Sequence, residues 1–351
     1  MTPKQKSEMV KLIRNRQPNT TTLSIGDGAN DVNMITSANI GIGIIGVEGR
    51  QAMRASDYAI SQFKYLKRLL FVHGRESYRK NSFVVCYNFY KNFLFVLPHF
   101  WFGFLNYFSG NYLYDPWIYQ FFNIIFTSFP IIWFGIYDKE VSYDLLMIDN
   151  RYYTQGIIGK LFHPFRFWKW VFYGILQAIF VFIYSFYGDI TPMKNGFLQD
   201  LPSSGSIAYS NIVLIVNFKI LQTTCTHSFI SAFLFLGSVL SYYFILFIMS
   251  LYWKFFNFNN FYMMAYSINF YFSTFCFLMI CFTIDVGLGK LFRIYGLIRD
   301  PLEINLDDFD KDVKERTIEL IRMEFQEINE KNNLYTGSAF NQSENKEVFN
   351  V

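Results

Sequence analysis

Six apolar, aromatic-rich stretches constrain the fold of this chain more than any other feature of its sequence. About 20 consecutive apolar residues are enough for a helix to cross the hydrocarbon core of a bilayer. Phenylalanine and tyrosine are abundant in these stretches, and aromatic residues make up 21% of the chain. We therefore predict an all-α domain of six transmembrane helices within residues 81–290. The helices are predicted at about 83–105, 116–136, 167–187, 207–226, 229–251 and 264–286.

The basic residues between these stretches predict the orientation in the membrane, because Lys and Arg are more frequent in cytoplasmic loops. Between Lys64 and Arg299, fourteen Lys and Arg residues lie between the stretches or at their ends on one side of the predicted membrane, against only Lys194 and Lys254 on the other side. The asymmetry predicts an integral membrane protein with both termini in the cytoplasm. Residues 291–351 would form a cytoplasmic tail, with an amphipathic helix over 307–332 and a disordered polar end.

Residues 1–80 have a different pattern, which is typical of a soluble α/β domain. Short strands are predicted at 21–25, 40–45 and 58–60, and helices at 7–16, 32–38 and 48–56. Strands that alternate with helices indicate a parallel sheet. Because 80 residues are too few for a whole doubly wound domain, we expect this sheet to lack strands.

Composition excludes several classes of function. The net charge of +4 is small and spread along the chain, so no nucleic-acid-binding surface is predicted. The four cysteines lie in apolar stretches without the spacing of a metal site or a disulfide framework. The segment 41–46 matches the G-x-G-x-x-G pattern, but its isoleucines indicate a strand interior rather than a turn that opens a helix. We therefore do not interpret it as a dinucleotide site.

The segment 22–31, Thr-Leu-Ser-Ile-Gly-Asp-Gly-Ala-Asn-Asp, predicts a magnesium and phosphate loop. Asp27 would follow a strand and offer carboxylate oxygens to Mg²⁺, while the flanking glycines allow close backbone approach. Asn30 could donate to a phosphoryl oxygen at the start of the next helix. Asp31 could hold a water molecule of the metal or cap the helix. The alternative is that Asp31 is only an N-cap and Asp27 only a turn residue.

Polar residues inside the first two apolar stretches indicate a second candidate site. Lys91 lies within the first stretch beside Asn92, where a charge is costly and is a functional hypothesis by default. The second stretch contains Asn123, Thr127 and Pro130, and a helix interrupted by proline often marks a transport path. The alternatives are a snorkelling or structurally bonded lysine and a simple kink.

With both sites placed, the chain resembles the C-terminal part of the type IV P-type ATPases, the phospholipid flippases. The resemblance is strong from residue 2 to about 140 and continues by the pattern of apolar stretches to about 301. The motifs that carry it are Thr2-Pro3-Lys4-Gln5-Lys6, Gly26 to Asp31, Val47 to Ala52, Ser56 to Ala59, Gln62 to Leu66, Leu69 to Arg75, Phe89 to Asn92, Tyr114 to Trp117, Thr127 to Pro130 and Gly135 to Asp138. A weaker similarity to an inhibitory tail element covers Thr336 to Phe340.

The resemblance implies a fold, cofactors and partners. The fold would be a partial α/β haloacid-dehalogenase-like phosphorylation domain in residues 1–80, followed by the six-helix transmembrane domain. ATP and Mg²⁺ are the implied cofactors, and a phospholipid and a two-span accessory subunit are the implied partners. The membrane would be the plasma membrane or an endomembrane.

The resemblance also implies roles for residues of both candidate sites. Lys6 would contact phosphate or nucleotide, Asp27 and Asp31 would bind the metal, and Asn30 would position the phosphoryl group. The residues that would border the lipid headgroup route are Lys91, Asn92, Asn123 and Thr127.

Two alternatives remain at this point. In cation pumps the corresponding motif resembles Asn-x-x-Thr-Asp-x-x-Pro; here Asn123 and Pro130 keep the spacing, but Thr127 stands in place of the acid. A desolvated cation needs carboxylates, so a flippase is favoured. The family's Asp-Lys-Thr-Gly-Thr string, which carries the nucleophile, is absent from this sequence. We therefore expect the chain alone to be inactive: a truncated flippase, or else a catalytically dead regulatory or complementing subunit.

Overall fold

A computed structural model describes residues 1–294, with the exception of 19, 46–49, 150, 158, 160, 189–199, 253–254, 256 and 267. The predicted tail helix and the tail element near Thr336 lie outside the described residues, as does most of the predicted tail. The chain divides into two compact units. One comprises Met1–Phe83 and Val141–Leu161, and the other comprises Val84–Glu140 and the chain from Phe162 onward.

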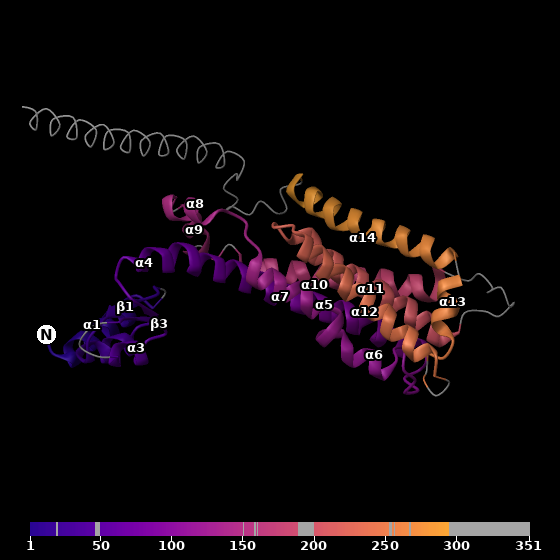
Figure 1. Ribbon diagram of the computed structural model, residues 1–351, viewed down its shortest axis with the longest axis horizontal. Helices are drawn as coiled ribbons and strands as arrows, with labels where there is room; N and C mark the ends of the chain where they lie inside the picture. Colours follow the sequence, from indigo (N-terminus) through magenta and orange to yellow (C-terminus); the bar gives the residue numbers. More distant parts are fainter. Residues whose placement is uncertain are drawn as a thin grey trace, which may run out of the picture. The chain divides into compact units, whose positions relative to one another are not determined.

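The first unit contains the parallel sheet that the sequence predicts. Its strands β1 (Leu23–Gly26), β2 (Ile40–Ile44) and β3 (Tyr58–Ile60) pair in the order β1-β2-β3, and both pairings are parallel. Between them in the chain lie η1 (Ala29–Asp31), α2 (Val32–Ser37) and α3 (Gln51–Ala55). Figure 1 labels β1, β3 and α3 of this unit. Gly41 and Gly43 lie inside β2 and open no helix, so among the described residues of segment 41–46 the structure agrees with the rejection of a dinucleotide turn.

Small residues let the helices of this unit pack closely on the sheet. Ile42 of β2, Ile35 of α2 and Ala52 of α3 are buried and form the core. A Cβ on Gly43 would lie 2.7 Å from the Cα of Met53, and non-bonded Cβ contacts this short essentially never occur in proteins. The short strands of this sheet therefore depend on glycine where a helix crosses them.

The helix α1 (Pro3–Arg16) begins with a capping box, which explains why it starts earlier than predicted. The Thr2 hydroxyl accepts a hydrogen bond from the backbone of Gln5, and the Gln5 side chain accepts one from the backbone of Thr2. Pro3 occupies the first helical position, where its missing N–H costs nothing. The cap therefore fixes where Lys6 stands on the helix.

The first unit also contains α4 (Tyr65–Arg68), the π-helix η2 (Leu69–Gly74), α8 (Tyr143–Ile148), α9 (Arg151–Ile157) and the start of α5 (Arg75–Leu105). Glu76 forms ion pairs with Arg75 at 2.5 Å and with Arg79 at 3.0 Å. The Arg75 guanidinium lies 5.9 Å from the ring centre of Tyr152 in α9. This buried charge cluster therefore links α9 to the beginning of α5.

The second unit is a helical bundle. Besides α5 it contains α6 (Pro116–Phe121), η3 (Phe122–Phe126), α7 (Ser128–Tyr137), α10 (Pro164–Ile183), η4 (Tyr184–Gly188), α11 (Leu201–Thr223), α12 (Phe229–Ser250), α13 (Asn260–Tyr266) and α14 (Ile268–Ile294). Among the described residues, helices thus occupy most of each of the six apolar stretches.

Among the described residues, four helical segments are long and apolar enough to cross a membrane: Pro116–Tyr137, Pro164–Tyr187, Leu201–Thr223 and Phe229–Ser250. The pair Asn260–Tyr266 and Phe270–Thr283, bent by 80°, would be a fifth. The helix α5 is not among them, because Lys91, Asn92 and His99 dilute its apolar character. Six spans therefore remain a prediction.

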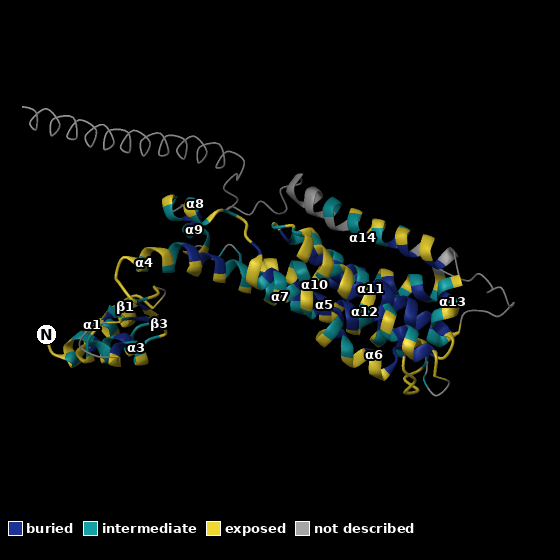
Figure 2. Cartoon of the chain, in the orientation of Figure 1, coloured by how far each residue is buried: buried dark blue, intermediate teal, exposed yellow. Residues whose placement is uncertain are grey.

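The helix α11 lies at the centre of the bundle. Of the 18 residues in its most apolar stretch, 78% are buried, whereas 28% are buried in the corresponding stretch of α12. Figure 2 shows the difference in burial between the two helices. Tyr209 of α11 packs against a cluster of aromatic rings: Phe95, Tyr114, Phe122, Phe126 and Tyr242. Polar side chains of a central helix are shielded from both water and lipid, so they need partners within the protein.

Candidate functional site

The loop that joins β1 to α2 is shaped by a close contact between Gly26 and Asp31. A Cβ on Gly26 would collide with the side chain of Asp31, so only glycine leaves room for that carboxylate. Asp27 and Asn30 lie on the same loop and are exposed. The loop therefore presents one exposed carboxylate, Asp27, and one enclosed carboxylate, Asp31, near the end of β1.

Lys6 and Asp31 come together although 25 positions separate them in the sequence. The Lys6 Nζ donates to Asp31 Oδ1 at 2.6 Å, and the Asp31 side chain is only 13% exposed. Asp31 precedes α2 but makes no capping hydrogen bond through its side chain. The interpretation of Asp31 as a simple N-cap is therefore wrong, because its carboxylate binds Lys6 instead.

The loop fits a magnesium ion in the chemistry of its donors but supplies few of them. Carboxylate oxygens are suitable ligands for Mg²⁺, which usually takes only one or two from the protein and completes its shell with water and phosphate oxygens. Asp27 and Asp31 are two such groups. Within the part of the chain that the structure describes, no cluster of three or more His, Cys, Asp or Glu side chains could hold a metal alone.

In the second unit the structure brings Lys91 and Thr127 together. Lys91 is 5% exposed, and its Nζ donates to Thr127 Oγ1 at 3.1 Å. The Nζ also lies 5.8 Å from the ring centre of Tyr87. Lys91 therefore does not snorkel. In the described residues no acidic side chain forms an ion pair with it, so its nearest polar contact is a neutral hydroxyl.

The helix that carries Thr127 is interrupted at this residue. The π-helix η3 ends at Phe126, and Thr127 departs from helical geometry with φ −132° and ψ −7° before α7 begins. The Thr127 hydroxyl donates to the carbonyl of Phe122 at 2.9 Å. Asn92 and Asn123 are exposed on the surface of the unit. Of the four predicted lipid-path residues, Lys91 and Thr127 are thus in contact and the two asparagines are not.

A second buried lysine, Lys219 of α11, was missed in the sequence. It is 9% exposed, and its Nζ lies 5.4 to 5.9 Å from the ring centres of Tyr90, Trp170 and Tyr173. Such distances allow cation–π attraction. The signal was available, because Lys219 lies inside the apolar stretch 207–226, where a charge is a functional hypothesis by default.

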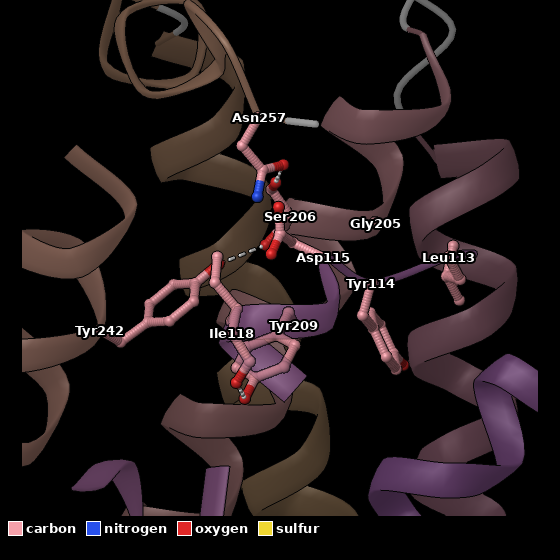
Figure 3. A pocket seen from close by; sticks show the side chains of 9 residues that line it. All are labelled: Leu113, Tyr114, Asp115, Ile118, Gly205, Ser206, Tyr209, Tyr242 and Asn257. Carbon is pink, nitrogen blue, oxygen red and sulfur yellow. Dashed lines mark hydrogen bonds between the residues drawn. The ribbon is translucent and has the colours of Figure 1, made fainter. Parts of the chain in front are cut away.

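A small cavity of about 10 Å³ lies beside the start of α6, large enough for about one water molecule (Figure 3). Asp115 contributes to its wall and caps α6 by accepting a hydrogen bond from the Trp117 backbone at 2.9 Å. Burial raises the pKa of Asp115, while backbone hydrogen bonds from Trp117 and Ile118 oppose the rise. The walls also include Ser206, whose hydroxyl donates to Asn257.

Comparison with known proteins identifies the family. The model of the family "Phospholipid-translocating P-type ATPase C-terminal" matches residues 53–295. A human probable phospholipid-transporting ATPase IM is 41% identical over 251 residues, which cover 71% of this chain and 21% of the relative. The Xenopus tropicalis phospholipid-transporting ATPase IC is 40% identical over 249 residues, 70% of this chain and 20% of the relative.

A yeast relative agrees with these two. The phospholipid-transporting ATPase DRS2 of Saccharomyces cerevisiae is 40% identical over 223 residues, which cover 62% of this chain and 16% of the relative. In these comparisons the chain spans about a fifth of the length of the curated relatives it matches.

Proposed function

This chain belongs to the phospholipid-translocating P-type ATPases, and we propose that it works as part of an ATP-driven flippase that moves phospholipid between bilayer leaflets. Its matched relatives are named as phospholipid-transporting ATPases. The single observation that carries the proposal is the buried contact between Lys91 and Thr127 at an interrupted helix.

The neutral partner of Lys91 favours a lipid headgroup over a metal cation. A dehydrated Na⁺ or Ca²⁺ needs several oxygen ligands, usually with carboxylates among them, and a lysine ammonium would repel it. An ammonium held by one hydroxyl keeps donors available for a phosphate group. Asn92 and Asn123, which are exposed, would border the same route. A cation pump is therefore the weaker alternative.

The loop of the first unit would act on phosphate. Lys6 would contact a phosphoryl oxygen or nucleotide, and its ion pair with Asp31 orients both side chains. Asp27, with Asp31 beside it, would hold Mg²⁺, and Asn30 would donate to the phosphoryl group. When bound, the metal supplies positive charge against the phosphoryl oxygens. Lys6 and Asn30 would stabilise charge at the same group.

The aspartate that accepts the phosphate would come from outside this sequence, which contains no Asp-Lys-Thr-Gly-Thr string. We propose that the chain works with this nucleophile and with a two-span accessory subunit. Motion of the phosphorylation domain would reach the lipid path through α5, the helix that begins at Arg75 and carries Lys91.

The test is the lipid-stimulated ATPase activity of the complex isolated from its native membrane through a tag on this chain. Lys91→Ala should reduce stimulation by phospholipid while phosphoenzyme formation remains. Lys91→Arg, which keeps the charge, should retain part of the stimulation. If Lys91→Ala responds to lipid as the wild type does, Lys91 has no part in the mechanism. If phospholipid stimulates neither protein, the flippase proposal is wrong.

A further inference from the structure

The interruption at Thr127 leaves the backbone carbonyl of Phe126 without the hydrogen bond that a regular α-helix would give it. In an α-helix the carbonyl of a residue accepts from the N–H four positions later. The residue four positions after Phe126 is Pro130, which has no N–H. Phe126 and Pro130 are both buried. A polar group buried inside a membrane domain needs another donor.

Asn217 of α11 provides that donor. Its Nδ2 lies 2.9 Å from the carbonyl oxygen of Phe126, and the side chain is fully buried. The same nitrogen donates to the carbonyl of Val213, also at 2.9 Å. Both amide hydrogens of Asn217 are therefore used, one within its own helix and one across to the interrupted helix.

The position next to Asn217 is also linked to the helix that carries Lys91. The hydroxyl of Tyr87 in α5 donates to the carbonyl of Val216 at 3.2 Å. One turn along α5, Lys91 binds Thr127, which directly follows Phe126. Three elements are thus bonded in a ring: α5 to α11, α11 to the carbonyl of Phe126, and Thr127 back to α5.

We propose that Asn217 is a positioning residue that fixes the interruption in the second apolar segment and so sets the place of Thr127 against Lys91. Asn217 replaces the hydrogen bond that Pro130 cannot make. The expected effect of Asn217 on transport rests on the proposed function. The hydrogen bond from Asn217 to Phe126 does not depend on that function, so the structural role of Asn217 and the flippase proposal can be refuted separately.

The test is a double-mutant cycle on the purified chain of 351 residues in detergent, with unfolding followed by tryptophan fluorescence. Asn217→Ala in the wild-type background should raise the unfolding equilibrium constant about tenfold, because the buried carbonyl loses its donor. Pro130→Ala restores an N–H at position 130, so in that background Asn217→Ala should change the constant less than about twofold. Equal effects in both backgrounds would overturn the proposal.

Asn211→Ala is the matched control, since Asn211 lies on the same helix and is also fully buried. Its two side-chain polar atoms have no hydrogen-bond partner among the described residues. Its effect should be the same in both backgrounds. If Asn217→Ala folds only together with Pro130→Ala, the proposal is supported. Failure to fold in both backgrounds, while Asn217→Leu folds in both, contradicts it.

A second measurement on the tagged complex connects the bond to transport. Asn217→Ala should raise the phospholipid concentration that half-maximally stimulates ATP hydrolysis several-fold, without loss of phosphoenzyme, and Pro130→Ala should restore it. Coupling in the stability cycle without any lipid stimulation would reject the proposed function and keep the bond. Lipid stimulation without coupling would reject the role of Asn217.

Discussion

Replacement of Thr127 by valine tests the contact on which the lipid path is built. Valine keeps the shape of threonine but removes Oγ1, which accepts from Lys91 at 3.1 Å and donates to the carbonyl of Phe122 at 2.9 Å. Thr127 is fully buried and Lys91 is 5% exposed, so water cannot readily replace the lost hydroxyl. A hydrogen bond to a charged group contributes about 1.5–3 kcal/mol.

The expected contribution of this hydrogen bond is smaller in a membrane domain. Hydrogen bonds between helices of a membrane protein contribute about 0.6 kcal/mol on average and at most about 1.7 kcal/mol. We therefore expect Thr127→Val to destabilise the chain by about 1–2 kcal/mol. Denaturant titration of the purified protein in detergent micelles measures this change. Lys91→Met in combination with Thr127→Val should cost less than the sum of the two single changes.

Thr127→Ser is the matched control, because serine keeps the hydroxyl and loses only a methyl group. We expect Thr127→Ser to be more stable than Thr127→Val and to keep its coupling to Lys91. Equal stability of the serine and valine variants, within about 0.5 kcal/mol of the wild type, would refute the reasoning. The hydroxyl would then have no energetic role at the interruption.

Three further predictions concern other parts of the chain. Asp27→Ala should abolish Mg²⁺-dependent phosphoenzyme formation in the tagged complex, and persistent phosphoenzyme would remove Asp27 from the metal site. Glu76→Gln should destabilise the first unit by about 3 kcal/mol, measured by thermal unfolding, because it breaks ion pairs with Arg75 and Arg79 that are largely shielded from water. Burial raises the pKa of Asp115 above its ordinary 3.8, so wild-type stability should fall as the pH rises from 3.8 through the raised pKa. Asp115→Asn keeps the cap but cannot ionise, so its thermal midpoint should change less over this pH range than that of the wild type. A dependence of the midpoint on pH equal to that of the wild type would contradict the prediction.

Sequence periodicity predicts the strands and helices whose burial follows from the pattern of apolar residues in their own segment. The strands at 21–25, 40–45 and 58–60 appear at nearly the same positions in a parallel sheet, because short apolar runs between turn residues have few other solutions. Helices occupy most of the described part of each apolar stretch, because a helix satisfies its own backbone hydrogen bonds and a bilayer core offers no other partners.

The contacts of the site depend on partners that are distant in the sequence. Lys6 and Asp31 were each predicted as functional, but their ion pair follows from the packing of α1 beside α2. Pro130 predicted an interrupted helix, yet Asn217, which donates to the carbonyl of Phe126 at this interruption, lies 91 positions from Phe126. No local pattern indicates such a partner.

Exposure separates the predicted lipid-path residues in a way that periodicity did not. Asn92 follows Lys91 directly, so the two point to different faces of α5, and only Lys91 is buried. Asn123 lies on the π-helix η3, four positions before Thr127, and is exposed. The π-helix alters the angular relation that a regular α-helix would give these two residues.

The most direct test of the flippase proposal is ATP-dependent movement of a fluorescent phospholipid between the leaflets of proteoliposomes that contain the tagged complex. A flippase should remove the labelled lipid from the leaflet that faces the ATP-free side, at a rate that falls in Lys91→Ala and that vanishes without Mg²⁺-ATP. If no labelled phospholipid moves in a complex that hydrolyses ATP, the proposal is contradicted.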